Sequence, residues 1–282
     1  MKMKISIENY RFREALGDEM TIKVIADAGF DAMDFSYYWV KKAEDPLSCD
    51  YRDFAKRIRE RLDAAGIVCN QAHAPFDFAF GESQDESSEN YLRLTRSIES
   101  AAILGAEQII VHRIGNPDKA VEWEYNLGFY RRLRKHAEKA GIRIAVENLF
   151  KWSPESGITG SYGKPEELCE VVEELGVDRF TCCVDLGHAA ITGTAPEDFI
   201  AGMKDGMLGA LHVQDNDLTS DGHLLPYMGR INWDAVMSAL KAKNYDGDLT
   251  LEVFGWLGKL PASLMADAAV FAARTADQLR RL

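Results

Sequence analysis

The sequence predicts a TIM barrel, an α/β fold in which eight parallel strands close into a barrel inside a ring of helices, formed by residues 1–282 as one domain. Three observations predict this fold. Eight short runs rich in β-branched and aromatic residues occur along the chain, helical patterns separate them, and the long irregular connections follow strands. Eight alternating β-α units in one uninterrupted chain favour a closed parallel barrel over an open sheet.

Each expected strand begins one β-α unit. We expect the strands at residues 4–8, 32–38, 67–74, 108–115, 142–150, 180–189, 208–216 and 248–255. Between them, segments such as 165–176 carry apolar residues at helical spacing and end at a glycine or an asparagine. A final helix is expected over about 261–282.

Three long irregular connections follow strands, at residues 75–89, 150–164 and 215–230. The connections that follow helices are short by comparison. Active sites of barrel enzymes are built from the loops at the carboxyl ends of the strands. The asymmetry therefore predicts a pocket on that face.

Composition and charge narrow the class of protein. Hydrophobic residues make up 46% of the chain and charged residues 28%, which is typical of a globular protein with a core. The net charge of −12 disfavours a nucleic-acid partner, although a local cleft can differ in sign from the whole surface. Five cysteines without CxxC spacing predict a reducing, cytoplasmic setting, and we identify neither a targeting signal nor a membrane span.

Ionisable residues gather where the expected strands end. They are His73, His112, Glu147, Asp185, His212 and Glu252, and His188 follows Asp185 by three residues. In a barrel these strand ends converge on one pocket, where isolated charges would be costly to desolvate but a divalent cation makes carboxylates and imidazoles favourable. Any single one of them could instead be a hydrogen-bonded polar group. His136 lies on a basic helical face and is expected at the surface.

Five motifs carry a resemblance to a known family. They are the Glu147-Asn148 pair in AVENLF, DxxH in VDLGHA, HxxD in LHVQDN, PxxGxINW in PYMGRINW and the glutamate of TLEVFG. Together they resemble the xylose-isomerase-like TIM barrels, which include sugar phosphate isomerases and epimerases and the apurinic-site endonucleases. The resemblance spans nearly the whole chain, whereas each motif alone is weak.

The resemblance implies a function and a ligand set. By it, Glu147, Asp185, His212 and Glu252 hold one divalent metal ion, preferably manganese, with magnesium, cobalt or zinc as alternatives and no nucleotide cofactor. Three carboxylates and one imidazole also suit a harder ion than thiolates would. The expected activity is isomerisation or epimerisation of a small sugar, keto-sugar or sugar phosphate, in which Glu147 and Glu252 exchange a proton through an enediolate.

A second reading comes from the same superfamily. Five further residues match the additional zinc ligands of apurinic-site endonucleases, which are multi-zinc phosphodiesterases: His73, His112, His188, Asp221 and His223. The residues after Asn148 and the Leu186-Gly187 pair depart from the endonuclease pattern, and the charge indicates no basic DNA track. We therefore expect the five to bind substrate. For His188, orientation of Asp185 is an equal alternative.

The loops suggest the walls of the pocket. Phe76 and Trp152 are our preferred wall residues, because aromatic side chains can stack on the apolar face of a sugar ring. The segment 157–164 could offer backbone amides to a phosphate but lacks P-loop spacing, so phosphorylation of the substrate stays open. A homo-oligomer is compatible with the sequence. A barrel that only binds metal or sugar is a third reading, which the intact pair of glutamates disfavours.

Overall fold

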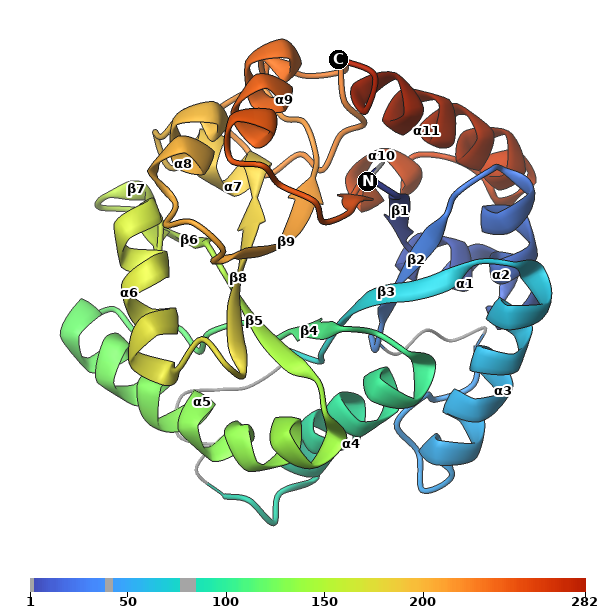
Figure 1. Ribbon diagram of the computed structural model, residues 1–282, viewed down its shortest axis with the longest axis horizontal. Helices are drawn as coiled ribbons and strands as arrows, with labels where there is room; N and C mark the ends of the chain where they lie inside the picture. Colours follow the sequence, from blue (N-terminus) through green and yellow to red (C-terminus); the bar gives the residue numbers. More distant parts are fainter. Residues whose placement is uncertain (1–2, 39–42, 77–84) are drawn as a thin grey trace.

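The computed structural model describes residues 3–38, 43–76 and 85–282. Its parallel strands form a closed barrel in the order β1-β2-β3-β4-β5-β8-β9-β10, which confirms the predicted fold (Figure 1). The strands are β1 (Ile5–Glu8), β2 (Ala32–Ser36), β3 (Val68–His73), β4 (Gln108–Ile110), β5 (Arg143–Glu147), β8 (Phe180–Asp185), β9 (Leu208–Val213) and β10 (Leu249–Leu251). Each lies within an expected range.

Helices surround the barrel and bury one face each against it. They are α1 (Tyr10–Leu16), α2 (Asp18–Asp27), α3 (Tyr51–Ala65), α4 (Glu89–Leu104), α5 (Lys119–Ala140), α6 (Pro165–Leu175), α7 (Leu186–Ile191), α8 (Pro196–Gly202), α9 (Trp233–Ala242), α10 (Phe254–Leu257) and α11 (Met265–Leu279). In α3, Phe54, Ile58 and Leu62 follow at intervals of four and are buried. Gly66, with φ of 73°, ends that helix in the left-handed conformation that glycine adopts without strain.

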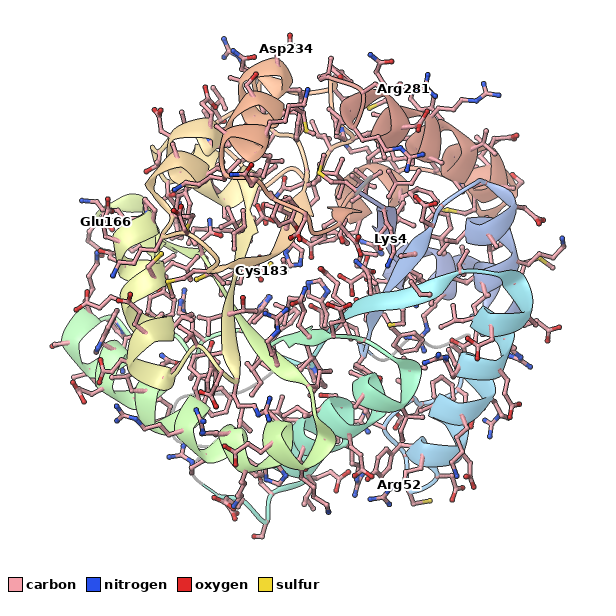
Figure 2. The ribbon with its side chains drawn as sticks, in the orientation of Figure 1. Lys4, Arg52, Glu166, Cys183, Asp234 and Arg281 are labelled. Atoms are coloured by element: carbon pink, nitrogen blue, oxygen red, sulfur yellow. The ribbon has the colours of Figure 1, made fainter. Side chains whose placement is uncertain are left out.

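Side chains fill the barrel interior, so the ring of strands is a packed core. Figure 2 shows Cys183 in the middle of the ring, while Arg52, Glu166, Asp234 and Arg281 lie on its rim. Ile110, Ala145, Cys183 and Ala210 form a small apolar cluster of buried side chains. Elsewhere, Asn70 accepts a hydrogen bond from Ser6 (2.7 Å) and donates one to Thr250 (3.1 Å).

Seven of the eight barrel strands end earlier than expected, and two of these ends carry acidic residues of the site. The strand expected at 180–189 stops at Asp185 because the Asp185 side chain accepts a hydrogen bond from the backbone N–H of His188 (2.6 Å) and so caps α7. The strand expected at 142–150 stops at Glu147. Both corrections place the acidic residue at the mouth of the barrel.

The connection expected as irregular over 150–164 contains a β-hairpin. β6 (Leu149–Ser153) pairs antiparallel with β7 (Gly157–Ser161) outside the barrel. Glu122 of α5 fastens both strands, because it contacts Lys151 of β6 and accepts a hydrogen bond from Ser161 of β7. A glycine-rich segment thus acquires strand structure from a contact that is distant in sequence.

The C-terminal segment agrees with its prediction apart from its first turn. Ala262–Leu264 form a 3-10 turn and α11 follows as Met265–Leu279, within the expected 261–282. Within the described part of the chain, we find no helix with the length and apolar character needed to cross a membrane.

Candidate active site

Four residues from neighbouring strands meet at the carboxyl end of the barrel. Glu147 ends β5, Asp185 ends β8, His212 lies in β9 and Glu252 follows β10 directly. One side-chain ligand atom of each lies within 4.8 Å of those of the other three, and all four residues are buried. We call these four residues the central cluster. The sequence-predicted ligand set is therefore brought together.

The central cluster contains buried polar atoms without a partner. Glu147 Oε2, His212 Nε2 and Glu252 Oε2 make no hydrogen bond. His112 Nε2 comes within 2.9 Å of Glu147 Oε2, but the contact does not meet hydrogen-bond geometry. Such atoms are costly inside a protein unless something satisfies them. Three carboxylates and an imidazole that face one another fit a divalent cation with a preference for oxygen.

Asn148 explains why the motif pairs it with Glu147. Its side-chain oxygen accepts a hydrogen bond from the Asp185 N–H (2.7 Å), and its amide nitrogen donates to the Asp185 carbonyl (3.0 Å). The Asn148 carbonyl also lies 3.0 Å from His188 Nδ1. One asparagine therefore ties the end of β5 to the end of β8 and orients His188.

The five other sequence-predicted polar residues flank the central cluster in two groups. His73 and His112 form a metal-sized group with Glu147, and His188, Asp221 and His223 form another. Within the second group, Asp221 Oδ2 lies 3.0 Å from His223 Nε2, and Asp221 Oδ1 lies 3.5 Å from His188 Nε2. All nine predicted polar residues thus belong to one continuous site.

Each histidine of the site packs against another ring. Phe76 stacks on His112 (centroids 4.8 Å apart), Phe254 stacks on His223 (3.7 Å), Phe150 meets His188 edge-on (5.2 Å), and His73 stacks on His212 (4.5 Å). These contacts pack each imidazole against an aromatic surface.

The two preferred wall residues differ in their surroundings. Phe76 lies in the site through its contact with His112, although 46% of it is exposed. Trp152 is 67% exposed, and Phe150, two residues earlier on β6, makes the contact with His188. Because alternate residues of a strand share a face, Trp152 extends the Phe150 face towards the tip of the hairpin.

Asp215, the last residue of the HxxD motif, organises the loop that carries Asp221 and His223. Its carboxylate accepts hydrogen bonds from the backbone of Tyr227 (3.0 Å) and Ile231 (3.1 Å) and from the indole of Trp233 (3.1 Å). The motif residues of PYMGRINW therefore hold the loop, and Asp215 itself is buried beneath it.

Burial and the neighbouring imidazoles shift the pKa values of the three carboxyl groups of the central cluster in different directions. Burial alone would raise the pKa of Glu147, but the imidazoles of His212 and His112 hold it well below its usual range. Glu252 likewise keeps a lowered pKa despite burial, because of His212 and His223. Burial raises the pKa of Asp185 to about 7, although His188 opposes the shift. Both glutamates are therefore ionised at neutral pH, as ligands and bases require.

Sequence reasoning missed two buried acids of the site. Glu8 ends β1 and accepts hydrogen bonds from Ser36 and from the backbone of Tyr10, and burial raises its pKa to about 7. Asp34 of β2 lies 3.0 Å from His73 Nδ1. The signal was present, since each acid ends or interrupts an apolar run, KISIE and AMDF.

His136 differs from its expectation as a surface residue. It is only partly exposed, its ring lies 6.1 Å from that of Tyr91, and burial lowers its pKa. The apolar face of α5 therefore extends further round the helix than the basic residues beside His136 suggest.

Comparison with known proteins places this architecture in a family. The chain is 28% identical over 262 residues to the uncharacterised protein MJ1311 of Methanocaldococcus jannaschii, covering 89% of this chain and 84% of that protein. It is 24% identical over 243 residues to L-ribulose 3-epimerase of Mesorhizobium japonicum, covering 84% and 75%.

A solved structure shares the fold over almost the full length. A D-tagatose 3-epimerase-like protein superposes with a TM-score of 0.73 at 23% identity, covering 98% of this chain and 99% of that one. The family model described as xylose isomerase-like TIM barrel matches residues 22–272. The chain therefore belongs to the xylose isomerase-like TIM barrel family.

Proposed function

We propose that this protein is a divalent-metal-dependent isomerase or epimerase that acts on a small sugar, keto-sugar or sugar phosphate. One observation carries the proposal: Glu147 and Glu252, from strands separated by two others in the barrel, each direct an unpartnered buried oxygen into the same cluster. A site that only binds a ligand does not need two bases around one point.

The central cluster would hold the metal, for which manganese is our expectation. Bound there, the ion would polarise a carbonyl of the substrate and stabilise negative charge that develops on its oxygen. The residues fit such an ion because three carboxylates supply hard oxygen ligands, and His212 presents an unpartnered Nε2.

The two glutamates would move the proton. As an ionised carboxylate, one of them would remove a proton from the carbon beside the substrate carbonyl. The other, after taking up a proton from water, would donate it to the same carbon from the other side. His188, His223 and Asp221, which lie together beside the central cluster, would hydrogen-bond the oxygens of the substrate. His112 with its Phe76 cover, and Trp152 at the hairpin, would bound the pocket against water.

The relatives support the substrate class without fixing the sugar. L-ribulose 3-epimerase and the D-tagatose 3-epimerase-like protein carry names of ketose epimerases. An epimerase needs a base on each side of one carbon, which agrees with the two glutamates of the central cluster.

A second candidate is a multi-zinc phosphodiesterase. The observation that favours it is the pair of flanking groups, each of which brings three ligand atoms within 4.8 Å. With the central cluster they offer places for three ions, and Glu147 is shared between two of them. A phosphodiesterase would use such ions to activate water and to neutralise charge on the phosphate.

The deciding experiment compares three readouts on one metal-loaded preparation. We expect turnover of a ketohexose, a ketopentose, an inosose-type ketone or one of their phosphates, with deuterium from heavy water at the reacting carbon. We also expect about one tightly bound ion per chain by elemental analysis. Incision of abasic DNA by catalytic amounts of protein, together with three bound ions, would replace the isomerase proposal with the phosphodiesterase.

A further inference from the structure

Asp34 lies in β2 directly opposite Glu8 of β1, in unbroken register, and alternates with the core residues Met33 and Phe35. On its other side the register shifts in β3, where Met33 pairs with Cys69 but Asp34 pairs with Gln71, so that Asn70 is the extra residue of a bulge. Bulges disrupt a ladder locally and turn a side chain in a new direction, and they are frequent beside active sites. Asp34 is fully buried, so its carboxylate acts on other residues of the chain and not on solvent.

Both oxygens of Asp34 are engaged by β3. Oδ2 accepts a hydrogen bond from the side-chain amide of Gln71 (2.8 Å), and Oδ1 lies 3.1 Å from His73 Nδ1. A carboxylate oxygen accepts hydrogen bonds, so this contact favours the tautomer of His73 in which Nδ1 donates to Asp34. Gln71 fixes the carboxylate and thereby the direction of this bond.

The far side of the His73 ring faces the central cluster. Its Nε2 lies 3.3 Å from Glu252 Oε1, and its plane stacks on His212 at 4.5 Å and 24°. The other carboxylate oxygen, Glu252 Oε2, is the one left without a partner. The orientation of the His73 ring therefore affects Glu252, a proposed base, and His212, a proposed metal ligand.

We propose that Asp34 is a positioning residue, which holds His73 so that Nε2 faces Glu252 Oε1 and Glu252 Oε2 stays directed into the central cluster. Carboxylate partners that orient a histidine commonly change affinity or activity by about 10–100-fold when removed. The kinetic consequence rests on the proposed isomerase function. The orientation of His73 does not.

The first test is spectroscopic and uses the metal-free full-length protein. Long-range proton–nitrogen correlation spectra report the tautomer of each imidazole, and His73→Gln identifies the His73 signals. Asp34→Asn should change the His73 ring signals, whereas Asp31→Asn should not. Asp31 lies just before the same strand and pairs with Arg280 at the surface, so it is a matched control. Unchanged His73 signals in folded Asp34→Asn would overturn the proposal.

The second test is a double-mutant cycle on turnover. Asp34→Asn should lower kcat about 10–100-fold with little change in KM. In the His73→Gln background the same substitution should have almost no further effect, because its action passes through His73. Equal losses in both backgrounds would show that Asp34 only supports the fold.

Two controls keep the outcomes separate. If Asp34→Asn does not fold, Gln71→Met removes the donor that fixes the Asp34 carboxylate, and the same spectral change, smaller in size, is expected. If the wild type turns over none of the sugars, the proposed function fails, and the His73 spectra still decide the role of Asp34.

Discussion

The two ends of the barrel are both lined by polar residues, but they differ in how those residues are satisfied. At the amino end, a cavity of about 500 Å³ is lined by residues that include Lys4, Gln108, Arg143 and Asp248. There Arg143 donates to Gln108 (3.0 Å), and Gln108 donates to the carbonyl of Gly209 (2.7 Å). None of the described residues that line this cavity has a buried side-chain nitrogen or oxygen without a partner.

At the carboxyl end the opposite holds. Four buried atoms of the site make no hydrogen bond within the chain: His73 Nε2, Glu147 Oε2, His212 Nε2 and Glu252 Oε2. A self-satisfied polar network stabilises the fold, whereas a converging set of unsatisfied atoms has its partner outside the chain. Because both ends of the barrel are polar, the number of polar residues does not locate a site. Several buried atoms that make no hydrogen bond and converge on one point do.

The largest expected effect is loss of metal from the carboxyl end. Asp185→Ala should abolish the proposed metal binding, because it deletes one of the four proposed ligands while the packed barrel stays intact. Asp205→Ala, an exposed carboxylate at the amino end that pairs with Lys243, is the control. Equal metal content of the wild type and Asp185→Ala by elemental analysis would contradict the proposed metal site at the carboxyl end.

Next in size is the loss of turnover on removal of either base. Glu147→Gln and Glu252→Gln keep an oxygen for coordination but lose basicity, so each should lower kcat about 10²–10⁴-fold with a smaller effect on substrate binding. The measurement is steady-state kinetics with deuterium incorporation from heavy water. Near-normal turnover in both variants, with no label, would point to a hydride shift and exclude the two-glutamate scheme.

A third prediction concerns Glu8 at the carboxyl end of the barrel. Its raised pKa should make the free energy of unfolding depend on pH. Its pKa is raised from 4.5 to about 7 by burial, so the folded state keeps the proton where the unfolded chain has lost it. Stability from this group is present below pH 4.5 and is lost as pH rises through about 7. Between these limits the wild type should lose about 3 kcal/mol relative to Glu8→Gln. Denaturant unfolding of both proteins across this range measures the difference, and parallel pH profiles would contradict the assignment.

The smallest expected effect lies at the amino end, where we expect a substitution to change stability but not metal binding. A Cβ on Gly209 would meet Thr181 Oγ1 at 2.2 Å, and Thr181 is buried. Gly209→Ala should therefore lower the free energy of unfolding by about 1–3 kcal/mol, as overpacking does. Chemical denaturation measures this loss, and metal content should stay at the wild-type value. A large loss of metal would show that the two ends are coupled.

Periodicity and strand-end chemistry predicted most of the fold and site. The barrel strands alternate with helices so regularly that local pattern suffices, and Glu147, Asp185, His212 and Glu252 all stand where those strands end. Asp34 was missed because it lies inside β2 and not at its end, and its partners Gln71 and His73 follow a register shift in β3 that the sequence does not reveal. Local patterns do not encode such register shifts.

The hairpin of β6 and β7 was not predicted from the sequence, for a different reason. Residues 149–161 contain a proline, serines and glycines that are typical of loops, and their pairing depends on Glu122 of α5. A buried carboxylate that joins segments distant in sequence produces no periodic signal. Long-range polar contacts of this kind are what single-sequence reasoning cannot supply.

The hydrogen bonds that Asp215 accepts also order the segment that carries Asp221 and His223. One buried carboxylate gathers donors from Tyr227, Ile231 and Trp233, so the chain that presents Asp221 and His223 is ordered before any ligand arrives. The conformational entropy of that segment is lost during folding and not during the encounter with a substrate. A substrate that contacted this rim would therefore meet an ordered segment, and few contacts would be enough to hold it in one orientation.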